Sequence, residues 1–125
     1  MFNILIVDDE LDVLDAIMMN FSLFLTKSKF ILNEFSDSLK ALDEITNNDI
    51  YSILISDIDM PNLDGIDLIK QVREKNKKIE IFIFSGNITP EIKDDLKDLR
   101  INEFVEKPNL ELLVEKINNL ELQLS

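Results

Sequence analysis

The chain of 125 residues contains no cysteine, no histidine and only two glycines. Without cysteine it can form neither disulfides nor thiolate metal sites. Because histidine is missing as well, a zinc site, a Ser-His pair and a Cys-His pair are also excluded. Two glycines cannot supply a glycine-rich loop that cradles phosphates, which argues against a nucleotide-binding module. The side-chain groups that remain for a functional site are therefore mainly carboxylates, hydroxyls and amines.

Basic residues are scarce too, since 25 acidic residues against 13 basic ones give a formal net charge of -12. Direct nucleic-acid binding needs a basic surface that displaces phosphate counterions, so we expect none. Metal cations or basic partner surfaces suit this charge better, although much of the acidic excess serves only solubility.

Targeting and membrane-spanning segments are not evident. Met1 leads directly into a predicted strand, and no apolar run approaches transmembrane length. We therefore expect a cytoplasmic protein without membrane contact. The length suits one domain over residues 1–125, which can bury a hydrophobic core without disulfides.

Short apolar runs alternate with helical patterns five times. The predicted strands are Phe2–Val7, Phe30–Phe35, Tyr51–Ser56, Glu80–Phe84 and Phe104–Glu106. The first predicted helix runs from Leu11 to about Leu25, and the second runs from the capping residues Ser36–Ser38 to Asn48. Three more helices are predicted after the capping residues Asp64, Thr89 and Asn109, and the last of them reaches Leu124. A polar break is expected at Lys27–Lys29. Near-continuous apolar strands separated by helices indicate an α/β fold with a doubly wound parallel sheet.

Two helices carry informative surface patterns. In the first, Val13, Met19 and Phe24 widen the apolar surface beyond one stripe, so they pack against a neighbouring helix or the sheet edge, or they contact a partner. In the helix after Asp64, the predicted inner face is Ile66, Ile69 and Val72, and the predicted outer face is Lys70, Arg73 and Lys75.

Polar residues follow the carboxyl ends of four strands: Asp8, Asp9 and Glu10, then Asp57 and Asp59, then Ser85, then Lys107. Taken singly, such residues are more often turn, cap or surface residues. In an open parallel sheet, however, strand ends meet at the edge where ligands bind. Their joint occurrence therefore predicts one shared site.

The chemistry of this set is specific. Crowded carboxylates repel one another, and a cation removes the repulsion. Oxygen-only ligands favour a hard ion, Mg²⁺ above all, with Mn²⁺ and Ca²⁺ as alternatives. Ser85 and Lys107 have no part in holding a cation, and an ammonium group indicates an anion. The combination predicts phosphoryl transfer onto an aspartate, with Asp57 at the end of the central strand as the acceptor.

The order and spacing of these motifs resemble the receiver domain of two-component response regulators. The matching motifs are Asp8-Asp9-Glu10, Asp57-Ile58-Asp59-Met60-Pro61 with Asp64-Gly65, Ser85-Gly86 and Lys107-Pro108. The resemblance covers essentially the whole chain. It implies a flavodoxin-like, CheY-like fold with strand order 2-1-3-4-5 and five helices on two faces.

The resemblance also implies a phosphorelay function. Asp57 would accept a phosphoryl group from a phosphohistidine on a sensor histidine kinase or a histidine phosphotransfer protein. Asp9 and Asp57 would bind Mg²⁺ directly, together with the backbone carbonyl of Asp59, and Asp8 would act largely through water. The protein would catalyse its own phosphorylation and slow dephosphorylation, and would not turn over an external substrate.

A two-state switch is implied as well. Lys107 would pair with the phosphoryl oxygens, Ser85 would donate a hydrogen bond to the phosphoryl group, and Phe104 would turn inward. Some residues depart from the common pattern: Ser85 stands where threonine is frequent, Phe104 lacks the hydroxyl of a tyrosine, and Arg100–Glu103 lacks the glycine found in many relatives. Asp59 adds acid beside the site, which predicts an altered phosphoaspartate lifetime.

Two other classes of protein fit part of this motif set. Asp57-Ile58-Asp59 also fits the nucleophile motif of a haloacid-dehalogenase-like phosphatase, but no later acidic metal motif or cap domain accompanies it. A receiver-like module that works without phosphorylation is a third alternative, although the acceptor, metal and lysine positions are all kept. The output domain or target, and a phosphorylation-dependent homodimer through the fourth and fifth helices, are undetermined. The predicted kinase-docking surface is Leu11, Leu14, Asp15 and Met18.

Overall fold

The computed structural model describes residues 2–25 and 30–124, with side chains described up to residue 120. The predicted break at Lys27–Lys29 and the side chain of Leu124 lie outside the described residues. None of the described helices combines the length and the apolarity that crossing a bilayer requires.

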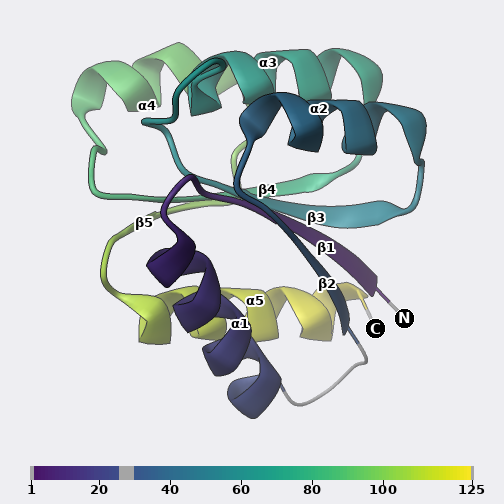
Figure 1. Ribbon diagram of the computed structural model, residues 1–125, viewed down its shortest axis with the longest axis vertical. Coiled ribbons are helices and arrows are strands. Elements are labelled where there is room, and N and C mark those ends of the chain that lie inside the picture. Colours follow the sequence, from purple (N-terminus) through teal and green to yellow (C-terminus); the bar gives the residue numbers. More distant parts are fainter. Residues whose placement is uncertain (1, 26–29, 125) are drawn as a thin grey trace.

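Five parallel strands form the centre of the molecule (Figure 1). They are β1 (Phe2–Val7), β2 (Phe30–Phe35), β3 (Tyr51–Ser56), β4 (Glu80–Ser85) and β5 (Glu103–Glu106). Their order is β2-β1-β3-β4-β5, as predicted. β4 and β5 each include one residue more than predicted, so Ser85 is the last residue of β4 and not the first residue of a loop.

The helices lie in two layers, one on each face of the sheet (Figure 1). One layer contains α1 (Leu11–Phe24) and α5 (Leu110–Leu124). The other contains α2 (Ser38–Asn47), α3 (Gly65–Lys75) and α4 (Pro90–Leu96), which continues into a short 3₁₀ turn, η1 (Lys97–Leu99). The predicted doubly wound α/β fold is confirmed.

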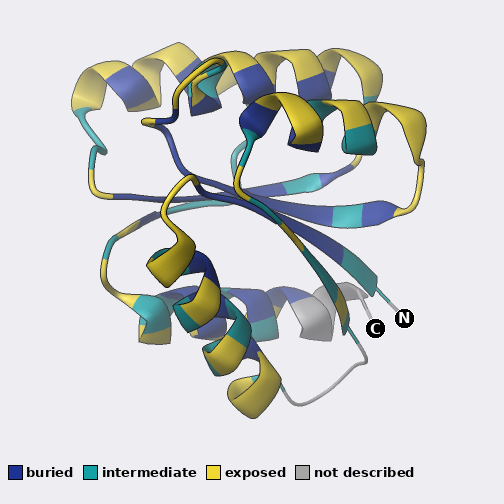
Figure 2. Ribbon diagram, in the orientation of Figure 1, coloured by how far each residue is buried: buried dark blue, intermediate teal, exposed yellow. Residues whose placement is uncertain are grey.

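The sheet separates two hydrophobic cores, and its central strands are buried throughout most of their length (Figure 2). Alternate residues of each strand face opposite layers: Leu54 contributes to the core under α2, α3 and α4, whereas Ile53 and Ile55 contribute to the core under α1 and α5. Burial on both faces explains why β1, β3 and β4 read as near-continuous apolar runs, whereas the edge strand β2 includes Asn33 and Glu34. A rigid sheet therefore holds the polar strand ends in fixed positions.

Helix starts follow the predicted capping residues. The carboxylate of Asp37 accepts hydrogen bonds from the amides of Leu39 and Lys40, and Asp64 and Thr89 each cap their helix in the same manner. Ser38 is an exception, because it lies inside α2 and its hydroxyl donates to the carbonyl of Pro61 at 3.2 Å. This bond ties the start of α2 to the loop that follows β3.

The prediction that Arg73 lies on the outer face of α3 is wrong. Its side chain is only 5 % exposed and donates hydrogen bonds to four backbone carbonyls, those of Asn76, Ile79, Leu99 and Arg100. Burial lowers the pKa of Arg73, and the nearby charge of Arg100 acts in the same direction. Lys70 and Lys75 are exposed, as predicted. Arg73 thus links α3 to the segment between η1 and β5.

Candidate functional site

The polar residues predicted from the strand ends lie at the carboxyl edge of the sheet. The backbone amide of Asp57 donates to the carbonyl of Val7 at 3.2 Å, and the amide of Lys107 donates to the carbonyl of Ser85 at 3.0 Å. These bonds extend the sheet pairing one residue beyond β3 and β5. The backbones that carry the acceptor candidate and the lysine are therefore held as firmly as the strands.

Three carboxylates form a compact cluster at this edge. Asp8, Asp9 and Asp57 each offer one oxygen, and these oxygens lie within 4.8 Å of one another. Asp8 and Asp57 are buried, the latter only 4 % exposed. An all-oxygen donor set of this size and charge fits a hard divalent cation. The Mg²⁺ site stays a prediction, and these three carboxylates are the side chains that would hold the ion.

The ammonium group of Lys107 lies between two of these carboxylates. It is 2.8 Å from Oδ2 of Asp8 and 3.0 Å from Oδ2 of Asp57, with Glu10 further away at 3.8 Å. Burial opposes the charged form of Lys107, but the hydrogen bonds to Asp8 and Asp57 raise its pKa overall. Burial also raises the pKa of Asp8, against the hydrogen bonds from Lys107 and the Glu10 amide. The single positive charge of Lys107 therefore balances only part of the negative charge of Asp8, Asp9 and Asp57.

Gly65 fixes the position of the Asp57 backbone. A Cβ atom at position 65 would lie 2.0 Å from the carbonyl oxygen of Asp57, so the start of α3 approaches this backbone more closely than any side chain permits. The amide of Gly65 donates to the carbonyl of Ile58 at 2.7 Å, and the amide of Ile58 donates to Oδ1 of Asp57, also at 2.7 Å. Asp57 is thereby held in one orientation. The sequence motif contains Gly65, but this steric role emerges only from the fold.

Ser85 and Asp59 belong to a connected set of hydrogen bonds beside the cluster. The Ser85 hydroxyl is buried and accepts a hydrogen bond from the amide of Asn87 at 3.1 Å. The side-chain amide of Asn87 donates to Oδ1 of the exposed Asp59 at 3.2 Å. Asn87 was not predicted from the sequence, because only the fold brings it to Asp59, 28 residues away.

Phe104 lies on β5 and packs against the core under α2, α3 and α4. Its ring is half-buried, and the ammonium group of Lys93 lies 5.7 Å from the ring centroid. β5 pairs with β4, with Phe104 opposite Ile83, two residues before Ser85. The two predicted switch residues therefore come from adjacent strands.

The predicted docking surface on α1 needs a correction. Leu11 and Asp15 are exposed and Met18 is half-buried, but Leu14 is only 3 % exposed and belongs to the core between α1 and the sheet. Leu14 lies one helical turn from Leu11, and the apolar pattern alone does not separate the inner edge of the helix from its outer edge. Leu14 is therefore not available to a partner.

The fold and the site identify a class of protein. A profile of the response regulator receiver domain matches residues 4–118, and the chain belongs to this family. Among its relatives, the sensor protein EvgS of Escherichia coli K12 is 34 % identical over 56 residues, which cover 45 % of this chain and 5 % of EvgS. The transcriptional regulatory protein FixJ of Bradyrhizobium diazoefficiens is 28 % identical over 85 % of this chain and 49 % of FixJ. The chain thus spans at most about half of either relative.

Solved structures show the same fold. A CheY-like receiver domain protein from Methanospirillum hungatei superposes with a TM-score of 0.85 at 21 % identity, covering 96 % of this chain and 93 % of that one. The chemotaxis protein CheY4 of Vibrio cholerae gives a TM-score of 0.81 at 23 % identity, covering 95 % and 98 %. The fold expected from the resemblance is therefore confirmed.

Proposed function

We propose that this receiver domain accepts a phosphoryl group on Asp57 from the phosphohistidine of a sensor histidine kinase or a histidine phosphotransfer protein. The observation that carries the proposal is the position of Asp57, whose Oδ2 lies 3.0 Å from the Lys107 ammonium within the Asp8, Asp9 and Asp57 cluster. A carboxylate nucleophile beside the Lys107 ammonium suits phosphoryl transfer, because the ammonium attracts the negative oxygens of the incoming phosphoryl group.

In the proposed reaction, an oxygen of Asp57 forms a bond to phosphorus while the bond from phosphorus to the histidine nitrogen breaks. The bonding electron pair remains on the imidazole. Lys107 pairs with the phosphoryl oxygens, and the amide of Ile58 holds the other carboxylate oxygen of Asp57 at 2.7 Å. Asp8, Asp9, Asp57 and the backbone carbonyl of Asp59 would hold Mg²⁺, with Mn²⁺ as a substitute, and the ion would neutralise charge on the transferring group.

Phosphorylation then biases a switch. The Ser85 hydroxyl would leave the Asn87 amide, which now donates to it at 3.1 Å, and would donate a hydrogen bond to the phosphoryl group. Phe104, on the adjacent strand, would turn inward into the space that becomes available. Lys93 loses its contact with the ring in that movement. The outer surface of α4, β5 and α5 would change accordingly, and a phosphorylation-dependent homodimer through α4 and α5 is the proposed consequence.

The kinase or phosphotransfer protein would dock on the exposed part of the α1 surface, Leu11, Asp15 and Met18, which begins one residue after Glu10. The further partner would be a target protein or an output domain. We propose a cytoplasmic location for the relay. Nucleic acid is not a proposed partner, because the net charge is -12.

Intact-protein mass spectrometry with acetyl phosphate tests the function. We expect one phosphoryl group per chain in the presence of Mg²⁺ and none when a chelator replaces it, because the carboxylate cluster then stays uncompensated. An unchanged mass under both conditions would instead support a phosphorylation-independent interaction module. Release of many equivalents of phosphate from a generic phosphate ester would support the phosphatase alternative.

Asp9→Asn is expected to change Mg²⁺ affinity and stability in opposite directions. No hydrogen bond or ion pair to the Asp9 carboxylate occurs within the described residues, so its charge adds repulsion to the cluster. Without divalent ions the variant should melt about 3 °C higher than the parent. Its Mg²⁺ dissociation constant should rise by about tenfold or more, because a direct ligand is weakened. Thermal melts over a Mg²⁺ titration measure both effects, and a variant that matches the parent in both would exclude Asp9 as a ligand.

Asp59→Asn is expected to slow the loss of phosphate from phosphorylated Asp57 several-fold. An exposed carboxylate beside the phosphoryl group can orient and deprotonate the attacking water, and an amide cannot take up the proton. The decay of the phosphorylated mass after removal of acetyl phosphate measures the rate. Asn87→Ala serves as the matched comparison, because it removes the partner of Asp59 but keeps the carboxylate. Equal decay rates in Asp59→Asn and the parent would remove this role.

A further inference from the structure

Positive charge gathers at the end of α3 and in the turn that follows it. Residues 70–78 carry five basic side chains and one acidic one, although acidic residues outnumber basic ones in the whole chain. Arg73 is buried, whereas Lys75, Lys77 and Lys78 are exposed. None of these three lysines forms an ion pair with any residue that the structure describes. Lys75 complements the dipole of α3, but Lys77 and Lys78 lie beyond the helix and need another explanation.

Hydrogen bonds fix the backbone of the turn formed by residues 76–79. Oδ1 of Asn76 accepts from the amide of Lys78 at 2.9 Å and from the amide of Ile79 at 3.0 Å. The guanidinium group of Arg73 donates to two carbonyls of the turn, and that of Arg100 donates to a third. Arg100 is itself exposed, so its charge adds to those of the lysines. The positive groups therefore stand on an ordered backbone, which a partner would not have to order on binding.

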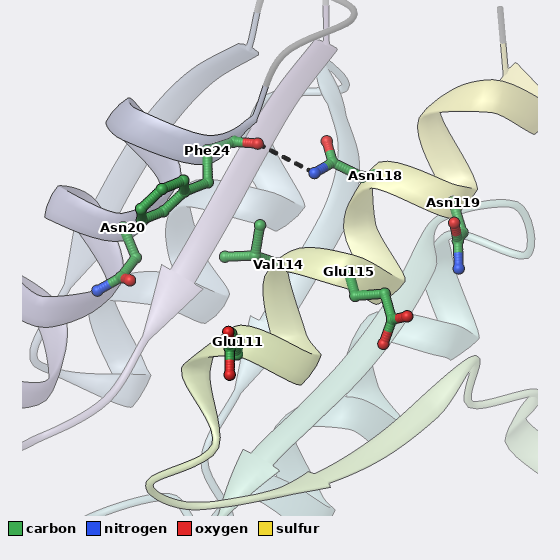
Figure 3. A pocket seen from close by; sticks show the side chains of 7 residues that line it. All are labelled: Asn20, Phe24, Glu111, Val114, Glu115, Asn118 and Asn119. Carbon is green, nitrogen blue, oxygen red and sulfur yellow. Dashed lines mark hydrogen bonds between the residues drawn. The ribbon is translucent and has the colours of Figure 1, made fainter.

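A hollow of about 400 Å³ lies beside this turn, between the ends of α2 and α3. The three exposed lysines line it together with Asp49. Asp49, and Glu74 and Glu80 on either side of the turn in the sequence, offset only part of the charge of the three lysines and two arginines. The hollow of about 610 Å³ between α1 and α5 differs, because it is lined mainly by asparagine and glutamate side chains (Figure 3). The hollow beside the turn is therefore a positive site on an acidic molecule.

The charge of the rest of the molecule decides which anionic partner fits this site. Charges act over about 8 Å at physiological ionic strength, so the turn attracts a short acidic segment without strong repulsion from distant carboxylates. Nucleic acid or an anionic membrane extends beyond the turn and would be repelled by a net charge of -12. A second copy in head-to-tail contact would have to overcome the repulsion between two acidic chains. A short acidic segment is therefore the favoured occupant.

We propose that Lys75, Lys77, Lys78 and Arg100 form a docking site for a short acidic segment of a partner protein. Carboxylates of that segment pair with the lysine ammonium groups and with the Arg100 guanidinium. The site lies at the amino-terminal edge of the sheet, because the turn directly precedes β4, whereas the carboxylate cluster lies at the opposite edge (Figure 1). Docking does not require phosphorylation, so it stands independently of the role of Asp57.

The test uses a labelled synthetic peptide of about 12 residues in which glutamates alternate with serines, long enough to cross the turn when extended. We expect saturable binding to the full chain by fluorescence anisotropy, and amide chemical-shift changes confined to residues 45–49, 75–79 and 99–101. Asp57→Ala should bind equally well. A peptide with glutamine in place of each glutamate should bind at least about tenfold more weakly, which corresponds to 1.4 kcal/mol.

Two double variants with the same net charge make the test specific to the turn. Lys77→Gln with Lys78→Gln should raise the dissociation constant of the acidic peptide about fivefold. Lys40→Gln with Lys97→Gln removes two exposed lysines elsewhere and should bind as the parent does. Equal dissociation constants in the two variants, or shift changes in other segments, would overturn the proposal. So would tighter binding of a short DNA duplex or of anionic vesicles than of the peptide, or a dimer in sedimentation velocity that only the Lys77→Gln, Lys78→Gln variant loses.

Discussion

Replacing Asp57 with alanine is expected to eliminate phosphorylation by acetyl phosphate completely. Alanine offers no oxygen to bond with phosphorus, so no rate remains to be measured at this position. The fold should tolerate the change, because Lys107 keeps its 2.8 Å ion pair with Asp8 and the strand pairing of β3 does not involve the side chain. Intact-protein mass spectrometry with Mg²⁺ measures the outcome, and circular dichroism confirms the fold.

Asp8→Ala is the matched comparison for this prediction. Asp8 is also a buried carboxylate paired with Lys107, so the two variants remove similar groups from the same cluster. We expect Asp8→Ala to be phosphorylated more slowly but still to acquire one phosphoryl group. Borohydride reduction followed by peptide mapping would identify the modified residue. A phosphoryl group on Asp8, or on any residue in the Asp57→Ala variant, would contradict the assignment of Asp57.

The elements of this fold are readable from the sequence because local and global signals agree. The central strands β1, β3 and β4 are apolar on both faces, as a sheet covered by helices on both sides requires. The starts of α2, α3 and α4 carry side chains that bond to amides of their own helix. The grouping of Asp8, Asp57 and Lys107 follows from one topological rule, since carboxyl ends of parallel strands share an edge. The distances within the cluster and the orientation of Asp57 come from the structure.

The features that sequence patterns missed depend on contacts between distant segments. Leu14 was assigned to a partner surface because helical periodicity cannot show which edge of an apolar stripe the sheet covers. Gly65 is recognisable as a motif residue, but its closeness to the Asp57 carbonyl appears only after β3 and α3 are in place. Arg73 was placed on the outside because charged residues are seldom buried. Its acceptors at Leu99 and Arg100 lie 26 and 27 residues away along the chain.

Arg73→Ala is expected to lower the free energy of unfolding by about 2–4 kcal/mol. The guanidinium group donates to the carbonyls of Ile79 at 2.8 Å, Leu99 at 2.9 Å, and Asn76 and Arg100 at 3.2 Å. Alanine leaves these oxygens without their partner and opens space beneath the segment that leads into β5. Loss of a buried charge returns some stability, so the total is smaller than the sum of four hydrogen bonds. Urea denaturation measures the difference.

Two further substitutions separate the hydrogen-bond geometry from the charge. Lys75→Ala removes an exposed base from the same last turn of α3 and should change stability by no more than about 0.5 kcal/mol. Arg73→Lys keeps the charge but lacks the planar fork that reaches carbonyls on two segments, residues 76–79 and 99–100, so its stability should fall between the parent and Arg73→Ala. Because Arg73 anchors the turn before β5, both Arg73 variants should also speed amide exchange at Arg100 and Asn102. If Arg73→Ala unfolded at the same urea concentration as the parent, the buried guanidinium would not hold this turn in place.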